Sequence, residues 1–97
     1  MVNNINEISN PAKVKANFRK YKGNDDAKLE LSEKKDKKYK VIHDGKTTHF
    51  GSTMEDYTKH KDEIRRKSYL ARAQGIKGNW KSNKYSANNL AIYLLWA

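Results

Sequence analysis

The sequence contains no cysteine, which removes several kinds of chemistry at once. Disulfide bonds, thiolate metal sites and a cysteine nucleophile are excluded, and the fold is indifferent to the redox state of its surroundings. Long apolar runs are also missing, since LAIYLLWA at residues 90–97 falls far short of the roughly 20 residues that span a bilayer. The chain opens without the cationic start and apolar run of a signal peptide, so we expect a soluble protein of the cell interior.

Apolar and acidic residues are both scarce. Only 36% of the 97 residues are hydrophobic and 33% are charged, which predicts one domain at most, with a thin core whose order depends in part on a partner. Lys and Arg number 21 against 11 Asp and Glu, for a formal net charge of +10. This balance predicts an anionic partner, carrying phosphate or carboxylate groups, without indicating which.

Residues 11–22 predict a helix that is cationic on most of its surface. Asn10 is a favourable N-cap, Pro11 suits the first helical position and Gly23 supplies a C-terminal stop. The narrow apolar stripe at helical spacing consists of Val14, Phe18 and Tyr21. The candidate residues for an anionic partner are Lys13, Lys15, Arg19 and Lys20. An ordinary solvated face explains these charges equally well.

Residues 24–36 read as a polar linker with nearly balanced charge. Leu29 and Leu31 alternate with charged neighbours, which is a weak signal for a short edge strand. We therefore divide the chain into an N-terminal basic helix with a linker arm, residues 1–36, and a small domain, residues 37–97.

A β-hairpin at about residues 38–50 is the clearest local prediction. Asp44 and Gly45 lie between two β-rich runs and are typical of a type I′ two-residue turn. This turn sets His43 opposite Lys46 and Tyr39 opposite Phe50. The face expected to be buried carries Tyr39, Val41, Thr48 and Phe50.

A long basic helix is predicted at about residues 53–74. Ser52 and Glu55 match a capping box, Gly75 ends the pattern, and Asp62 can cap a second piece if the helix is broken. Its candidate anion-binding residues are Lys59, Arg65, Arg66 and Arg72.

A short C-terminal helix is predicted at about residues 87–96, with Ser86 as its N-cap. This segment is apolar nearly all round, so we expect it to dock on the hairpin and the long helix, with Trp96 in the core. The predicted fold class is therefore α+β.

The residues that could carry catalysis or bind a metal are better explained by structural roles. The hairpin register places His43 and His49 on opposite faces, and His60 lacks the spacing of a zinc motif. Ser52 is used as a helix cap and lacks the flanking pattern of a hydrolase nucleophile. We therefore expect no enzymatic activity, metal, cofactor or small-molecule substrate.

The segment NWKSNKY, residues 79–85, is the best local case for nucleic-acid binding. Trp80 and Tyr85 alternate with cations and could stack on bases while Lys77, Lys81 and Lys84 hold phosphates. The alternative is that Trp80 packs on the preceding helix and the lysines are merely solvated. Both interpretations stay open.

Residues 34–96 resemble a small, functionally uncharacterised family of large double-stranded DNA viruses. The matching motifs, in order, are KKYxV at 37–41, GKxxHFG at 45–51, DYTxHKD at 56–62, RxxYxxR at 66–72, NW at 79–80 and LLW at 94–96. The resemblance implies a virion protein, either a minor capsid or an assembly component that bridges or lines the shell through a basic surface. Its partners would be other virion or capsid proteins, met inside the host cell during assembly. The alternative is a protein that binds viral DNA or RNA.

Overall fold

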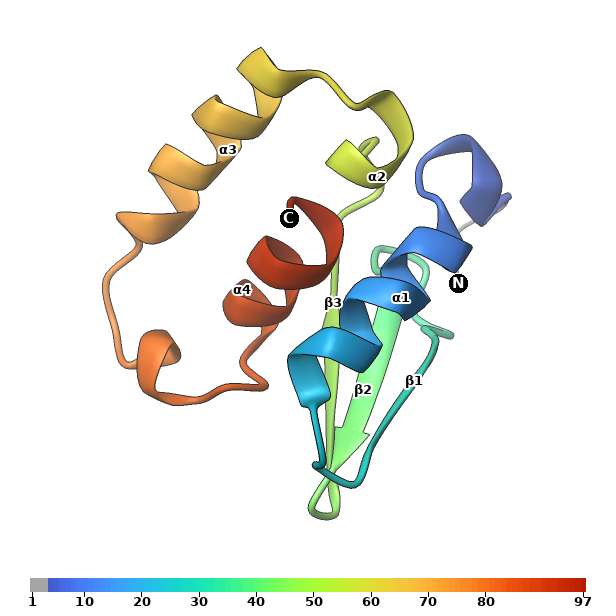
Figure 1. The fold of residues 1–97 in the computed structure, drawn as a ribbon, viewed down its shortest axis with the longest axis vertical. Helices are drawn as coiled ribbons and strands as arrows, with labels where there is room; N and C mark the ends of the chain where they lie inside the picture. Colours follow the sequence, from blue (N-terminus) through green and yellow to red (C-terminus); the bar gives the residue numbers. More distant parts are fainter. Residues whose placement is uncertain (1–3) are drawn as a thin grey trace.

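The computed structural model describes residues 4–97 and has an α+β fold (Figure 1). The elements, in chain order, are a 3₁₀ turn Ile5–Glu7, α1 Pro11–Lys22, β1 Ala27–Leu31, β2 Tyr39–His43, β3 Lys46–Phe50, α2 Tyr57–His60, α3 Glu63–Gln74, a 3₁₀ turn Trp80–Ser82, α4 Ala87–Leu90 and a π-helical turn Ala91–Leu95. The last two are continuous and are called the C-terminal helix below. Within the described residues, no helix is long and apolar enough to cross a membrane.

The predicted hairpin is confirmed in its turn and its register. Asp44 and Gly45 both have positive φ, at 54° and 74°, as a type I′ turn requires. His43 lies opposite Lys46, and Tyr39 lies opposite Phe50. A turn of fixed length between two alternating runs leaves only one register that buries the aromatic face, which is why local rules are sufficient here.

β1 lies inside the segment that the sequence predicts as a linker. It pairs antiparallel with β2, with Leu29 opposite Val41, and completes a sheet of order β1-β2-β3. Lys28 and Glu30 are exposed, so most of this edge strand faces solvent and its composition resembles that of a loop. The linker prediction is therefore wrong for residues 27–31, although the alternation at Leu29 was a genuine strand signal.

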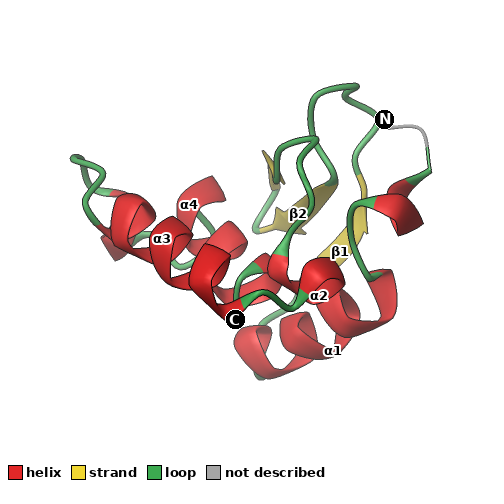
Figure 2. Cartoon of the chain, turned by 90° about the horizontal axis from the view of Figure 1, so that it is seen from above, coloured by secondary structure: helices red, strands yellow, loops and turns green. Residues whose placement is uncertain are grey.

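α1 and the C-terminal helix cover one face of the sheet (Figures 1 and 2). The large core residues contributed by the helices are Val14, Phe18, Leu90, Leu94 and Leu95, and those from the sheet are Tyr39, Val41 and Phe50. The core thus draws on both sides of the boundary at residue 36, and the division into an arm and a domain does not correspond to a division in packing.

The long basic helix is broken into α2 and α3. Asp62 caps α3 by accepting from the backbone N–H groups of Ile64 and Arg65, as the sequence predicts. The capping box at Ser52 and Glu55 is wrong, because α2 begins later and its cap is Asp56. Ser52 is exposed, whereas Asp56 is fully buried. Of the two candidate caps, the structure uses Asp56, the one whose side chain lies in the core.

A buried ion pair connects the start of β2 to the start of α2. The side chains of Lys38 and Asp56 are 2% and 0% exposed, and Lys38 Nζ lies 3.5 Å from Asp56 Oδ2. The same ammonium group donates to the carbonyl of Met54. Burial lowers the pKa of Lys38, while the Asp56 carboxylate acts in the opposite direction by favouring the charged form.

Hydroxyl groups extend this pair towards the N-terminal segment. Asp56 Oδ1 accepts from the Thr58 N–H at 3.0 Å and also from the Thr58 hydroxyl. Thr58 Oγ1 lies 3.3 Å from Ser9 Oγ, which accepts from the Tyr39 hydroxyl at 2.8 Å. Because the Thr58 hydroxyl donates its only proton to Asp56, Ser9 must be the donor to Thr58, and the three hydroxyls form a chain of donors that ends on the carboxylate.

The buried pair generates a stability prediction. Asp56→Asn leaves the Lys38 ammonium without its opposite charge, and Lys38→Met leaves the carboxylate alone, so each variant should lose about 3–5 kcal/mol in urea unfolding. The double variant should lose clearly less than the sum of the two, because neither charge is then buried alone. Glu33→Gln, which weakens an exposed pair with Lys40, is the control and should cost less than about 1 kcal/mol. Additive losses in the double variant would show that the two charges do not depend on each other.

Candidate binding groove

α3 stands away from the sheet and forms one wall of an open groove. The other walls are the end of the hairpin and the C-terminal helix, and the volume enclosed is about 700 Å³. Ser68 and Ala73 line it from α3, and Ala87 and Ala91 line it from the C-terminal helix. Side chains of this size cannot fill the space between two helices, so the groove stays open.

Gly51 allows the chain to pass close to the groove at the end of β3. It has a φ of +86°, and a Cβ at this position would lie 3.0 Å from Leu95 Cδ1 and 3.1 Å from Lys38 Cβ. Glycine is therefore required both by the left-handed backbone and by the lack of space. The resulting close approach brings the hairpin end against the C-terminal helix.

α3 is attached to the rest of the molecule mainly near its middle. The ring of Tyr69 stacks on that of Trp96, with centroids 4.3 Å apart and planes inclined by 10°. Arg66 Nε donates to the carbonyl of Trp96 at 2.9 Å, and Asn88 Nδ2 donates to that of Ala73 at 3.0 Å. Trp96 is half-buried, so it packs against the edge of the core and serves chiefly to hold α3.

Exposed apolar side chains gather on this groove. In the described chain, five large hydrophobic residues are well exposed, and three of them line the groove: Met54 at 66%, Ile64 at 79% and Ile76 at 53%. Single exposed apolar residues are normal on a protein surface. A cluster around one concave site is typical of a binding surface.

The charged residues of the groove are all cationic. Lys37, Arg65 and Arg72 line it, and no aspartate, glutamate or histidine does. Between residues 4 and 97, none of these three cations takes part in a salt bridge. The groove therefore combines an apolar interior with a positive rim whose charges have no acidic partner within the fold.

Arg66, another predicted anion-binding residue, has partners within the fold. Its guanidinium lies 2.9 Å from Glu63 Oε1 and 5.3 Å from the centre of the Tyr57 ring, besides its contact with Trp96. The Tyr57 hydroxyl and the Arg66 guanidinium hold the pKa of the Glu63 carboxyl below its usual range. Arg66 thus orders the junction between α2, α3 and the C-terminus.

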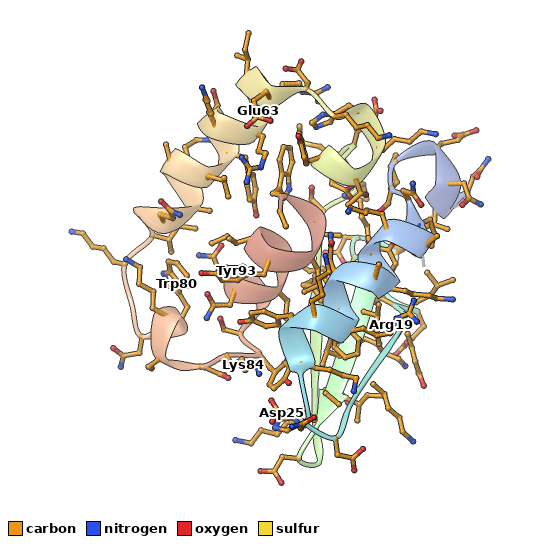
Figure 3. The ribbon with its side chains drawn as sticks, in the orientation of Figure 1. Arg19, Asp25, Glu63, Trp80, Lys84 and Tyr93 are labelled. Atoms are coloured by element: carbon orange, nitrogen blue, oxygen red, sulfur yellow. The ribbon has the colours of Figure 1, made fainter. Side chains whose placement is uncertain are left out.

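The NWKSNKY segment does not present its two aromatic rings together. Tyr85 is buried and donates to Asp25 Oδ2 at 2.7 Å, and Lys84 Nζ lies 2.9 Å from the same oxygen (Figure 3). Burial, and then the bond to Asp25, raises the pKa of Tyr85. Trp80 is half-buried and donates to the carbonyl of Ile76 at 2.7 Å. The remaining cations, Lys77 and Lys81, are exposed.

The predicted cations fall into separate groups. Those of α1, which are Lys13, Lys15, Arg19 and Lys20, are exposed, and α1 lies across the molecule from α3 (Figure 1). Lys59 is exposed on α2. The structure brings only Arg65 and Arg72 of the predicted set into the groove, and Lys37 joins them.

The histidines lie in different surroundings. His49 Nδ1 is 2.8 Å from Ser32 Oγ, the His60 ring accepts from the Asp62 N–H at 2.9 Å, and the His43 ring lies against Tyr85. In the part of the chain that the structure describes, no three His, Asp or Glu side chains are placed to hold a metal ion.

The comparisons with known proteins identify one similar family, and they assign no activity to it. Residues 27–73 match the model of a family of unknown function, DUF5754. The match extends from β1 through most of α3, so it covers the sheet and one wall of the groove and omits the C-terminal helix. No curated protein and no solved structure matches the chain. The resemblance to a viral family stays a prediction.

The attachment of α3 generates a test by hydrogen exchange. Trp96→Ala removes the ring that holds Tyr69, so amide protection in α3 should fall by about tenfold or more, while the sheet keeps most of its protection. Tyr93→Ala is the control, since this exposed ring stacks on Tyr21 of α1 instead. Equal loss of protection in α3 and the sheet would show that α3 unfolds only with the whole molecule.

Proposed function

We propose that this protein is a non-enzymatic virion protein, a minor capsid or assembly component, that binds another protein through the groove. The observation that carries the proposal is the gathering of Met54, Ile64 and Ile76 around one concave surface with an unpaired cationic rim. Such a surface is costly to leave exposed, and burial against a partner recovers the apolar contribution.

The chemistry of the lining supports binding over catalysis. Histidine and carboxyl groups are the commonest general acids and bases at neutral pH, and none of the described residues that line the groove carries one. Lys38 reaches the groove with its side chain, but its ammonium is engaged by Asp56 and the Met54 carbonyl. The groove offers shape, apolar contact and positive charge.

The viral setting of the proposal comes from the resemblance of residues 34–96. A small basic protein that lacks cysteine and offers a binding groove suits a role between larger proteins of a shell, where acidic surfaces need a cationic neighbour. Its thin core fits the same role, because a partner on the groove would add to the apolar area buried.

Nucleic-acid binding is the second candidate, and the exposed cations of α1 favour it. Five side chains on α1 carry positive charge, four of them exposed, without acidic neighbours on that helix, and the whole chain carries +10. Phosphate contacts of this kind need no groove. One observation argues against this candidate. Tyr85 and Lys84 both bind the Asp25 carboxylate within the fold, so the Tyr85 ring is not available to stack on a base.

The proposal is tested by incorporation into particles. Ile64→Glu places a carboxylate on an exposed apolar site near the N-terminus of α3, where it suits the helix, so the protein should fold yet enter particles at least about tenfold less. Lys67→Gln makes the same change in net charge on α3 outside the groove and should be incorporated normally. Quantitative mass spectrometry of purified particles gives the readout.

Two results would contradict the proposal. The first is absence of the unaltered protein from purified particles. The second is equal incorporation of the two variants together with tight DNA binding that falls steeply as salt rises, which would favour the nucleic-acid role.

A further inference from the structure

We infer that the occupant of the groove is an acidic amphipathic α-helix of the partner protein, an inference that rests on the proposed function. Two walls of the groove are helices. α3, with 12 residues, is about 18 Å long, and the C-terminal helix forms the facing wall. A third helix of three to four turns would lie in the groove, over the contacts that join these two walls, in the manner of helix-in-groove recognition.

The floor of the groove suits large side chains from such a helix. Ser68, Ala73, Ala87 and Ala91 leave space between the two walls, while Ile64 and Ile76 stand near the two ends of α3. Apolar residues of the partner at i, i+3 or i+4 and i+7 would fill the space between these isoleucines. Binding would remove both isoleucines from water.

An extended peptide fits the groove less well. Addition of a strand needs a row of free backbone N–H and C=O groups along the site. β3 contributes only Phe50 to the lining, and the rest of the surface consists of helix side chains and of loop residues before β2, after β3 and after α3. Recognition here must therefore use side-chain packing, which a helix provides.

The charge of the groove selects an acidic helix. Arg65 and Arg72 lie seven positions apart, two turns on the same side of α3, or about 10 Å along the helix. Lys37 lies on another wall. Carboxylates two turns apart beside the apolar stripe of the partner would reach both arginines. A second copy of this chain is a poor occupant, because each copy carries +10.

The inference is tested with a synthetic helix and the ¹⁵N-labelled full chain. The probe is a peptide of about four turns, roughly 15 residues, with leucines at i, i+3, i+4 and i+7 and glutamates on both flanks. The comparison peptide has lysine in place of each glutamate. We expect shifts of amide signals at Ile64, Tyr69 and Trp96, and at least about tenfold tighter binding of the glutamate peptide at low salt.

Reversing the charge of the two arginines in the groove tests whether they determine which peptide binds more tightly. Arg65→Glu with Arg72→Glu should reverse the preference, so that the lysine peptide binds more tightly. Lys46→Glu with Lys67→Glu makes the same change in net charge outside the groove and should keep the original preference.

Each outcome bears on a stated claim. Equal binding of the two peptides, or shifts away from the groove, would overturn the acidic-helix inference. If Ile64→Glu still prevents incorporation into particles in that case, the proposed function stands with a partner of another shape. If both tests fail, the proposed function falls as well.

Discussion

Lys38 and Asp56 form an ion pair inside a core that contains few apolar residues, with Lys38 Nζ and Asp56 Oδ2 3.5 Å apart. Each charge is acceptable in the interior only because the other is present. The Asp56 N–H also donates to the carbonyl of Ile8, and the hydroxyls of Thr58, Ser9 and Tyr39 extend the network. The pair thus fixes the N-terminal segment, the sheet and the start of α2 relative to one another.

The groove depends on this pair through the chain that follows it. Asp56 caps α2, α2 leads into α3, and Asp62 sets where α3 begins. Near its middle, α3 is held by Tyr69, whose ring stacks on Trp96 at the end of the C-terminal helix. α3 is therefore anchored at its start and along one face, while small residues keep it from closing on the C-terminal helix. A rigid but incompletely packed arrangement of this kind leaves an apolar surface available for a partner.

The sequence correctly predicts the parts of the fold that short segments determine by themselves, which are the hairpin turn and two of the helix caps. Asp44–Gly45 fixes the hairpin, and Asp62 and Ser86 cap helices where the sequence places them. The sequence favours Ser52 over Asp56 as a cap because Ser52 has the better local pattern, and only burial distinguishes the two. β1 has the composition of a linker because one face of an edge strand can be polar. The groove could not be predicted from the sequence, since it arises where two helices distant in the sequence touch at only a few residues, such as Tyr69 and Trp96, and leave the space beside these contacts unfilled. Its only sign in the sequence is the pair of isoleucines, Ile64 near the start of α3 and Ile76 just after its end, which stand among polar and charged neighbours.

The central claim is that the groove faces another protein in an assembled particle. Its most direct test is a photo-crosslinking amino acid placed at position 64, in the groove, or at position 67, on α3 outside the groove. The account predicts crosslinks from position 64 to a single different protein chain, and few from position 67. Crosslinks from position 64 to nucleic acid, or equal yields from both positions, would contradict it.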